Sequence, residues 1–443
     1  MKDIFTSFAA TAVIQVVTML GGLLTARLLL PEGKGELTAI ILWPSLLAYG
    51  GSLGLIEALA FHASDRKKDI THVLSSGLIV TIPLSLLLVG AGYVMLPLIL
   101  ASYGLDTIET ARLYLIYIPL NFVALSLMCI LASRLQLTAF NFLRMFVQIS
   151  FAAGILFLYA FDQISVRWFA EASLAATFLT MMIALGITWK NRWLGWRPDK
   201  QIAKTLFAYG WRVHLGAIAL QANLRLDQML MSIFLPSREL GLYVVAVSLS
   251  GIVNLSASSL VVVAFPRIAN LVSAREKGKA LGRYVRLGLL LSLLAAAPAA
   301  FFTPWLLHVF FGSAYLPAHA MTRVLIVASI PLSLNILLQS GLKAFGRPLA
   351  ASQAELLGLV VTAVSLCLLL PPYGALGAAW ASLLAYSAVG VCLLYLLRKH
   401  LSIRAVELLQ PTVADWDFVS SGLGVISKRT KSVLRRFFLC ARK

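Results

Sequence analysis

The chain has 443 residues, of which 60% are hydrophobic and only 12% are charged, and its formal net charge is +19. About a quarter of the residues of a soluble domain are charged, so this composition excludes an ordinary soluble protein. It indicates an integral membrane protein, whose positive charge contacts anionic lipid headgroups rather than nucleic acid.

Apolar runs long enough to cross a bilayer, roughly 20 residues each, recur along the chain. Only helices or closed barrels satisfy their backbone in lipid, and these runs are far too long for barrel strands. No small-residue cleavage site precedes the first run, so we expect a retained first helix rather than a secretory signal. We expect about 12 transmembrane helices, over residues 5–30, 36–62, 73–100, 109–133, 144–161, 166–189, 205–235, 240–271, 284–311, 319–341, 350–371 and 375–397. Pro371-Pro372-Tyr373-Gly374 predicts the turn between the last two.

Basic residues crowd every second connection between the expected helices. Segment 65–69 holds three, and segments 190–204 and 275–286 hold five each, whereas the connections between them are nearly bare. Lys and Arg near the ends of a span are retained on the cytoplasmic side. The pattern therefore predicts that the N and C termini both lie in the cytoplasm.

The tail after residue 397 is the only sizeable segment expected outside the membrane. Its last part, residues 427–443, mixes basic with apolar side chains. Such a segment is either an amphipathic helix on an anionic membrane surface or a disordered basic tail. The four cysteines have no metal-ligand spacing, so we expect no metal site and no disulfide framework.

The two halves of the chain resemble each other. Residues 30–36 form a charged, Pro-led turn with a Gly just before the second expected helix, and residues 235–241 do the same before the eighth. Chance similarity between Leu-rich and Ala-rich helices is the alternative explanation. A repeat predicts two six-helix lobes of the same orientation, residues 1–200 and 201–397, with a cavity between them and a tail from 398 to 443.

Ionisable residues inside spans are costly and are candidate functional residues. Gln221, Arg225 and Gln228 lie at i, i+4 and i+7 of the expected helix 205–235, so they share one face, which we expect to line a cavity. Asn223 and Asp227 lie on the same helix. The alternative is a structural network that holds this helix to a neighbour through a residue such as Glu57 in the second helix.

Other polar residues in the spans are open to two interpretations. Arg27 and Arg267 lie near helix ends, where they either bind an anion or extend to lipid headgroups. Asn335 either lines the cavity or makes a hydrogen bond between helices. No Walker loop, HExxH motif or pair of exposed carboxylates is present, so we expect no enzyme.

Several motifs resemble those of a known transporter family. They are Ala26-Arg27 with Pro31-Glu32-Gly33-Lys34-Gly35-Glu36, Gly54-Leu55-Ile56-Glu57-Ala58, Arg225-Leu226-Asp227-Gln228, Leu235-Pro236 with Gly241-Leu242-Tyr243, and Phe265-Pro266-Arg267. Over roughly residues 1–400 the chain is similar to the polysaccharide-transporter flippases of the multidrug/oligosaccharidyl-lipid/polysaccharide superfamily.

The resemblance implies a MATE-like fold that moves an undecaprenyl-pyrophosphate-linked oligosaccharide across the bacterial inner membrane by alternating access. It implies a cationic cavity, for which Arg27, Arg225 and Arg267 are suited, and coupling of H⁺ or Na⁺ at Asp227 or Glu57. It implies no cofactor, with a lipid-linked glycan as substrate and polysaccharide polymerase or assembly proteins as partners.

The alternative is a cation-coupled multidrug exporter of the same superfamily. Those exporters often carry an acidic residue in the first helix, where this chain has only Arg27. Lipid II flippases usually have fourteen helices, and only about 12 are expected here.

Overall fold

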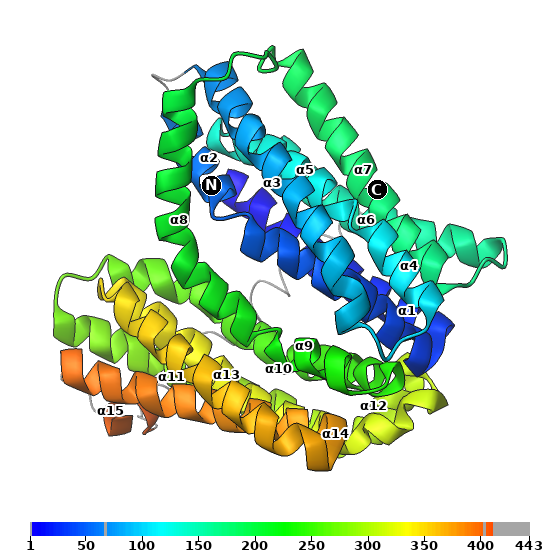
Figure 1. Cartoon of the computed structure of the whole chain (residues 1–443). Coiled ribbons are helices and arrows are strands. Elements are labelled where there is room, and N and C mark those ends of the chain that lie inside the picture. Colours follow the sequence, from blue (N-terminus) through cyan, green and yellow to red (C-terminus); the bar gives the residue numbers. More distant parts are fainter. Residues whose placement is uncertain (1, 66–68, 402–404, 411–443) are drawn as a thin grey trace, which may run out of the picture. The chain divides into compact units, whose positions relative to one another are not determined.

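The computed structural model describes residues 2–65, 69–401 and 405–410, and this part of the chain is helical and contains no strand (Figure 1). The α-helices are α1 (Lys2–Gly51), α2 (Leu55–Ser64), α3 (Ile70–Ile99), α4 (Leu105–Tyr114), α5 (Tyr117–Ser133), α6 (Leu137–Ala160), α7 (Val166–Lys190), α8 (Lys200–Asn223), α9 (Leu226–Phe234), α10 (Ser237–Ala269), α11 (Ala274–Phe301), α12 (Thr303–Leu306), α13 (His319–Ala344), α14 (Pro348–Leu401) and α15 (Ala405–Leu409). A π-helical turn, η1 (Leu307–Phe311), and a 3-10 helix, η2 (Ser313–Ala318), connect α12 to α13. The all-α expectation is confirmed.

Nine helical segments within the described residues are long and apolar enough to cross a membrane. Their surfaces carry large exposed apolar side chains, among them Leu87, Leu98 and Val391, as expected for contact with lipid. The chain is therefore a multi-pass membrane protein. The number of spans and the cytoplasmic termini stay predictions, and segment 427–443, for which two interpretations were open, lies outside the described residues.

Two continuous helical elements contain the turns that the sequence predicted. In α1, Leu30 has a φ of 60° and a ψ of 177°, directly before Pro31. In α14, Gly374 has a φ of 55° and a ψ of −137°, directly after the Pro371-Pro372-Tyr373 run. A proline disfavours helical geometry in the residue before it, and glycine tolerates positive φ, so both breaks follow from local sequence.

Several predicted helices differ in extent. The helix predicted over 36–62 is interrupted between α1 and α2, where Leu53 and Gly54 both have positive φ. The helix predicted over 144–161 already begins at Leu137, so Arg144 lies inside α6 rather than in a connection. The helix predicted over 284–311 ends at Phe301, because Pro304 starts a new short helix and Gly312, with a φ of 99°, stops the π-turn.

The chain divides into two compact units. The first comprises Met1–Gly251, Ala299–Ala328 and Glu355–Ala385, and the second comprises Ile252–Pro298, Ser329–Ala354 and Tyr386–Lys443. Each has its own apolar core. The predicted division into residues 1–200 and 201–397 stays a prediction.

In the first unit, connections that the charge pattern assigned to the outer side contact one another. A Cβ built at Gly35 would clash with the carbonyl oxygen of Ser237, and one built at Gly241 would clash with the carbonyl oxygen of Pro31. The Ala375 N–H donates to the Glu239 carboxylate at 2.9 Å. The turns after residues 30, 235 and 374 therefore lie together.

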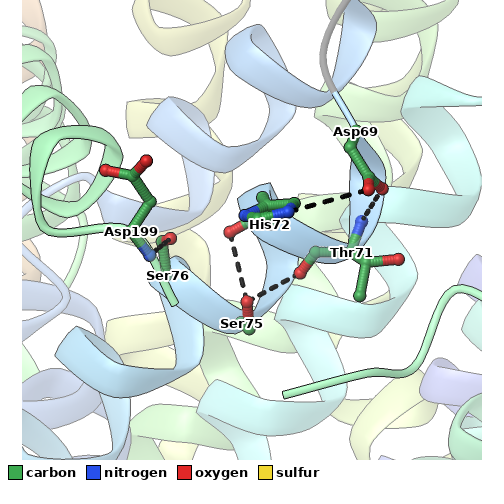
Figure 2. A network of polar contacts seen from close by, with 6 residues as sticks. All are labelled: Asp69, Thr71, His72, Ser75, Ser76 and Asp199. Carbon is green, nitrogen blue, oxygen red and sulfur yellow. Dashed lines mark hydrogen bonds and ion pairs between the residues drawn. The ribbon is translucent and has the colours of Figure 1, made fainter. Parts of the chain in front are cut away.

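Connections that the charge pattern assigned to the cytoplasmic side also contact one another. The Asp199 N–H donates to Ser76 Oγ at 2.8 Å, which joins the α7–α8 connection to the first turns of α3 (Figure 2). The Asn191 side chain donates to Gln136 Oε1 at 3.2 Å, which adds the α5–α6 connection. Both groupings agree with the predicted alternation, and which group faces the cytoplasm stays a prediction.

The start of α3 is stabilised by Asp69. Its carboxylate accepts the Thr71 N–H at 2.9 Å and lies 3.9 Å from His72 Nε2 (Figure 2). The backbone hydrogen bond from Thr71 lowers the pKa of Asp69, so its stabilising contribution is present at neutral pH and is lost as the pH falls through that lowered pKa.

We expect Asp69→Ala to destabilise the protein by roughly 0.5–1 kcal/mol at pH 7, because the first turn of α3 loses its capping group. Asp69→Asn should retain most of this stability, since Asn also caps helices, and should abolish the decline at low pH. Thermal unfolding in detergent at pH 7 and pH 3 measures both effects. Equal stability of Asp69→Ala and the wild-type chain at pH 7 would contradict this role.

Candidate functional site

A cavity of about 290 Å³ lies inside the first unit. Its walls come from α1, from α6, and from the segment where α8 gives way to α9. Hydroxyl groups of α1 contribute part of the lining, namely Thr18, Thr25, Thr38 and Ser45. Three amides, Gln148, Gln221 and Gln228, contribute another part. Within a membrane protein, a cavity lined by these polar groups is a candidate transport site.

Two of the residues that line this cavity are charged, Lys34 and Arg225, and both are cations. The lining contains no Asp or Glu. A cation in a membrane-embedded cavity is costly unless it meets water or an anion. The cavity is therefore suited to an anionic ligand.

A helix break positions Arg225. The predicted continuous helix 205–235 is wrong at this point, because α8 ends at Asn223 and α9 begins at Leu226, with Arg225 at a φ of −130° and a ψ of −7°. Asn and Asp side chains compete for backbone hydrogen bonds and so weaken helix interiors. The polar run from Gln221 to Gln228 explains why the helix is interrupted here.

Gln221, Arg225 and Gln228, which the sequence placed on one face, all line the cavity despite this break. Arg225 Nη1 donates to Gln228 Oε1 at 3.0 Å, so the amide fixes the guanidinium beside the cavity. Gln228 itself is buried.

Asp227 is turned away from this set and does not line the cavity. Its buried carboxylate accepts the Tyr243 hydroxyl at 2.6 Å and the Gln228 N–H at 2.7 Å. The Tyr243 hydroxyl also lies 3.3 Å from Ser382 Oγ. Through the Tyr243 hydroxyl, the carboxylate thus joins α9 to α10 and to the second part of α14.

Asn223 also joins helices rather than lining the cavity. Its Nδ2 donates to Glu355 at 2.9 Å, and its Oδ1 accepts the Thr362 hydroxyl at 2.9 Å. Both partners belong to the first part of α14.

The other predicted residues of the first unit lie outside the cavity lining. Arg27 is exposed, and its guanidinium donates to the carbonyl oxygen of Val309 and, at 2.7 Å, to that of Phe310. Glu57 is exposed in the first turn of α2.

Arg267 and Asn335 belong to the second unit. Arg267 is exposed and donates to the Tyr284 hydroxyl at 3.3 Å. Asn335 is buried, and its Nδ2 donates to the carbonyl oxygen of Tyr386 at 2.8 Å.

Sequence reasoning missed Lys34 and Thr25 as cavity residues. Lys34 stands next to the Pro-led turn, where a basic residue is expected to belong to a connection between helices. The turn is short, however, and α1 resumes at Pro31, so Lys34 already belongs to the helix that lines the cavity. The signal that could have identified Lys34 is its position: it is a basic residue on the outer side, where the connections are nearly free of Lys and Arg.

Comparison with known proteins identifies the family. The polysaccharide biosynthesis protein family matches residues 24–320. The probable low-salt glycan biosynthesis flippase Agl15 of Haloferax volcanii is 24% identical over 229 residues, or 51% of this chain and 48% of that protein. The match therefore spans about half the length of this curated relative.

Solved structures share the fold. The lipid II flippase MurJ in an inward closed conformation superimposes with a TM-score of 0.76 at 16% identity, over 89% of this chain and 87% of that one. An inward-facing multidrug resistance MATE family transporter of the MOP superfamily has a TM-score of 0.67 at 15% identity, over 89% and 98%. A MOP superfamily transporter from Pyrococcus furiosus has a TM-score of 0.53 at 13% identity, over 89% and 95%.

These relatives are transporters rather than enzymes, and their fold agrees with the polar cavity between membrane helices. The chain belongs to the polysaccharide biosynthesis protein family.

Proposed function

We propose that this protein is a flippase that moves an undecaprenyl-diphosphate-linked oligosaccharide, a polysaccharide precursor, across the bacterial inner membrane. The observation that carries the proposal is the cavity lined by Lys34 and Arg225, with hydroxyl and amide groups beside them and no carboxylate. Cations suit the diphosphate, and the hydroxyls and amides suit a sugar. Membership of the polysaccharide biosynthesis protein family supports the same substrate class.

In this proposal about 12 spans form two lobes with cytoplasmic termini, and alternating access exposes the cavity to each side in turn. The described cavity, at about 290 Å³, is just below the roughly 300–1,000 Å³ of typical ligand sites. It accommodates a headgroup but not a whole oligosaccharide, so the chain opens further to admit the glycan. Arg27 and Arg267 would contact the substrate in other states of the cycle.

An ion gradient would drive the cycle, with H⁺ or Na⁺ bound at Asp227 or Glu57. Of the two, the buried Asp227 is better placed, because it lies next in the chain to the cavity residue Gln228 and accepts the hydroxyl of Tyr243 in α10, which in turn contacts Ser382 in α14. The glycan would pass on to a polysaccharide polymerase or assembly protein, and the basic tail would contact anionic lipids.

Arg225→Ala should reduce surface polysaccharide at least tenfold in a bacterium that depends on this flippase, because the guanidinium lines the cavity. Truncating one partner of a charge-assisted hydrogen bond costs about 1.5–3 kcal/mol, which is roughly ten- to a hundredfold. The measurement is polysaccharide extracted from cells with equal amounts of the protein in the membrane. Arg238→Ala, an exposed arginine in the first turn of α10, is the matched control and should leave polysaccharide unchanged. Wild-type polysaccharide in Arg225→Ala cells would contradict the proposal.

A cation-coupled exporter of small molecules is the alternative, favoured by the shared fold with a MATE transporter and by the buried Asp227. It predicts drug susceptibility on deletion with no loss of glycan. The cationic cavity argues against it, since many exported drugs are themselves cations.

A further inference from the structure

Lys34 enters the cavity wall because α1 breaks at Leu30 and resumes at Pro31. Its Nζ donates to Thr25 Oγ1 at 2.6 Å, and the buried Thr25 hydroxyl in turn donates to the Gly22 carbonyl at 2.9 Å. With its own hydrogen directed at Gly22, this hydroxyl presents a lone pair to the ammonium. Thr25 therefore holds the ammonium in a fixed orientation beside the cavity.

The Lys34 ammonium has N–H donors left to bind a ligand. An ammonium has three N–H donors, and the Lys34 ammonium makes a single hydrogen bond, to Thr25, within the part of the chain that the structure describes. Neither the ion pair of Asp69 with His72 nor that of Arg167 with Glu171 involves Lys34. The cation is half-buried, and no carboxylate pairs with it in the described residues. Burying an unpaired charge costs free energy, and binding of an anion would offset that cost.

Arg225 supplies a second cation to the same cavity from a distant part of the sequence. Gln228 fixes it, as Thr25 fixes Lys34. Two oriented cations on different elements suit a ligand with several anionic oxygens, since each cation can bind a different one.

We propose that Lys34 binds the diphosphate of the lipid-linked substrate together with Arg225, each cation contacting a different part of that group. This inference rests on the proposed function and adds a binding residue to it. A purely structural role is the competing explanation: Thr25 lies before the Leu30 break and Lys34 after it, so their hydrogen bond also ties the two parts of α1 together.

Three variants separate these explanations. Lys34→Gln removes the charge but keeps a side chain that can hydrogen-bond to Thr25. Lys34→Arg keeps the charge. Thr25→Val breaks the hydrogen bond across the turn and keeps the charge, so a structural role predicts that it is at least as harmful as Lys34→Gln. Lys204→Gln, at an exposed lysine of α8, is the matched control for loss of one positive charge.

The test measures binding of undecaprenyl diphosphate to the full-length protein in lipid nanodiscs, with inorganic pyrophosphate and undecaprenol as the other two probes. We expect Lys34→Gln to weaken binding of undecaprenyl diphosphate roughly ten- to a hundredfold. Lys34→Arg and Lys204→Gln should each stay within about threefold of the wild type, because each keeps a cation at position 34. Thr25→Val should weaken binding less than Lys34→Gln, because the ammonium remains but is no longer oriented by the Thr25 hydroxyl. Undecaprenol, which lacks phosphate, should bind no variant differently from the wild type.

The possible results distinguish failure of the role of Lys34 from failure of the proposed function. If the wild type binds undecaprenyl diphosphate and Lys34→Gln binds it equally well, the role of Lys34 is wrong while the proposed function stands. If Thr25→Val weakens binding as much as Lys34→Gln, Lys34 acts structurally and the proposal is overturned. If the wild type binds pyrophosphate through Lys34 but not the lipid diphosphate, the anion site stands and the proposed substrate is wrong. If the wild type binds neither, both are wrong.

Discussion

Gly35→Ala is expected to disrupt the packing of α1 against α10. The added Cβ would clash with the carbonyl oxygen of Ser237 and lie 3.0 Å from Gly241 N, and both of these are backbone atoms that cannot rotate away. Overpacking costs typically about 1–3 kcal/mol, and here it also requires a whole helix to shift. We expect a lower melting temperature in detergent and at least a tenfold loss of exported polysaccharide.

Gly241→Ala should have the same effect, because the contact is reciprocal: its Cβ would clash with the Pro31 carbonyl oxygen and lie 2.9 Å from Gly35 N. The double variant should cost less than the sum of the two, since the first Cβ has already separated the helices. Gly90→Ala, at a position in α3 with no neighbour within 4 Å, is the matched control and should be neutral or slightly stabilising. Wild-type stability of Gly35→Ala would show that this end of the molecule is not closely packed in solution.

These two glycines illustrate what the sequence reveals and what it does not. The matched turns at Pro31–Gly35 and Pro236–Gly241 were visible as a repeat, because proline and glycine mark turns by their own backbone preferences. That the two repeats contact each other glycine to glycine was not visible. Such a contact is a tertiary relation between segments about 200 residues apart, and no local pattern encodes it.

The helices and the cavity-lining face were predictable for a similar reason. Long apolar runs require helices in lipid, and the i, i+4, i+7 spacing placed Gln221, Arg225 and Gln228 together. The break beside Arg225 was not predicted, because no proline or glycine marks it. Lys34 was missed because a basic residue near a turn reads as a topology signal, and only the three-dimensional path of α1 brings it to the cavity.

Asp227 provides the other large expected effect, and two substitutions distinguish its two roles. Asp227→Leu removes the acceptor of the Tyr243 hydroxyl and of the Gln228 N–H, both buried. Leaving a buried polar group unsatisfied costs about 1–3 kcal/mol, so we expect strong destabilisation whatever the function. Asp227→Asn keeps an acceptor oxygen for the Gln228 N–H, and its Nδ2 can donate to the Tyr243 hydroxyl, which then donates to Ser382 Oγ, so this variant should unfold within a few degrees of the wild type.

The functional consequence of Asp227→Asn decides whether this carboxylate couples transport to an ion gradient. An amide cannot take up and release a proton and is a poorer ligand for Na⁺ than a carboxylate, so a coupling role predicts loss of glycan export with the fold intact. Glu276→Gln, at an exposed acidic residue in the first turn of α11, is the matched control and should leave stability and transport unchanged. Transport measured with and without a proton or sodium gradient checks the prediction. If Asp227→Asn transports like the wild type and keeps the same gradient dependence, Asp227 holds α9 to α10 and α14 and has no coupling role.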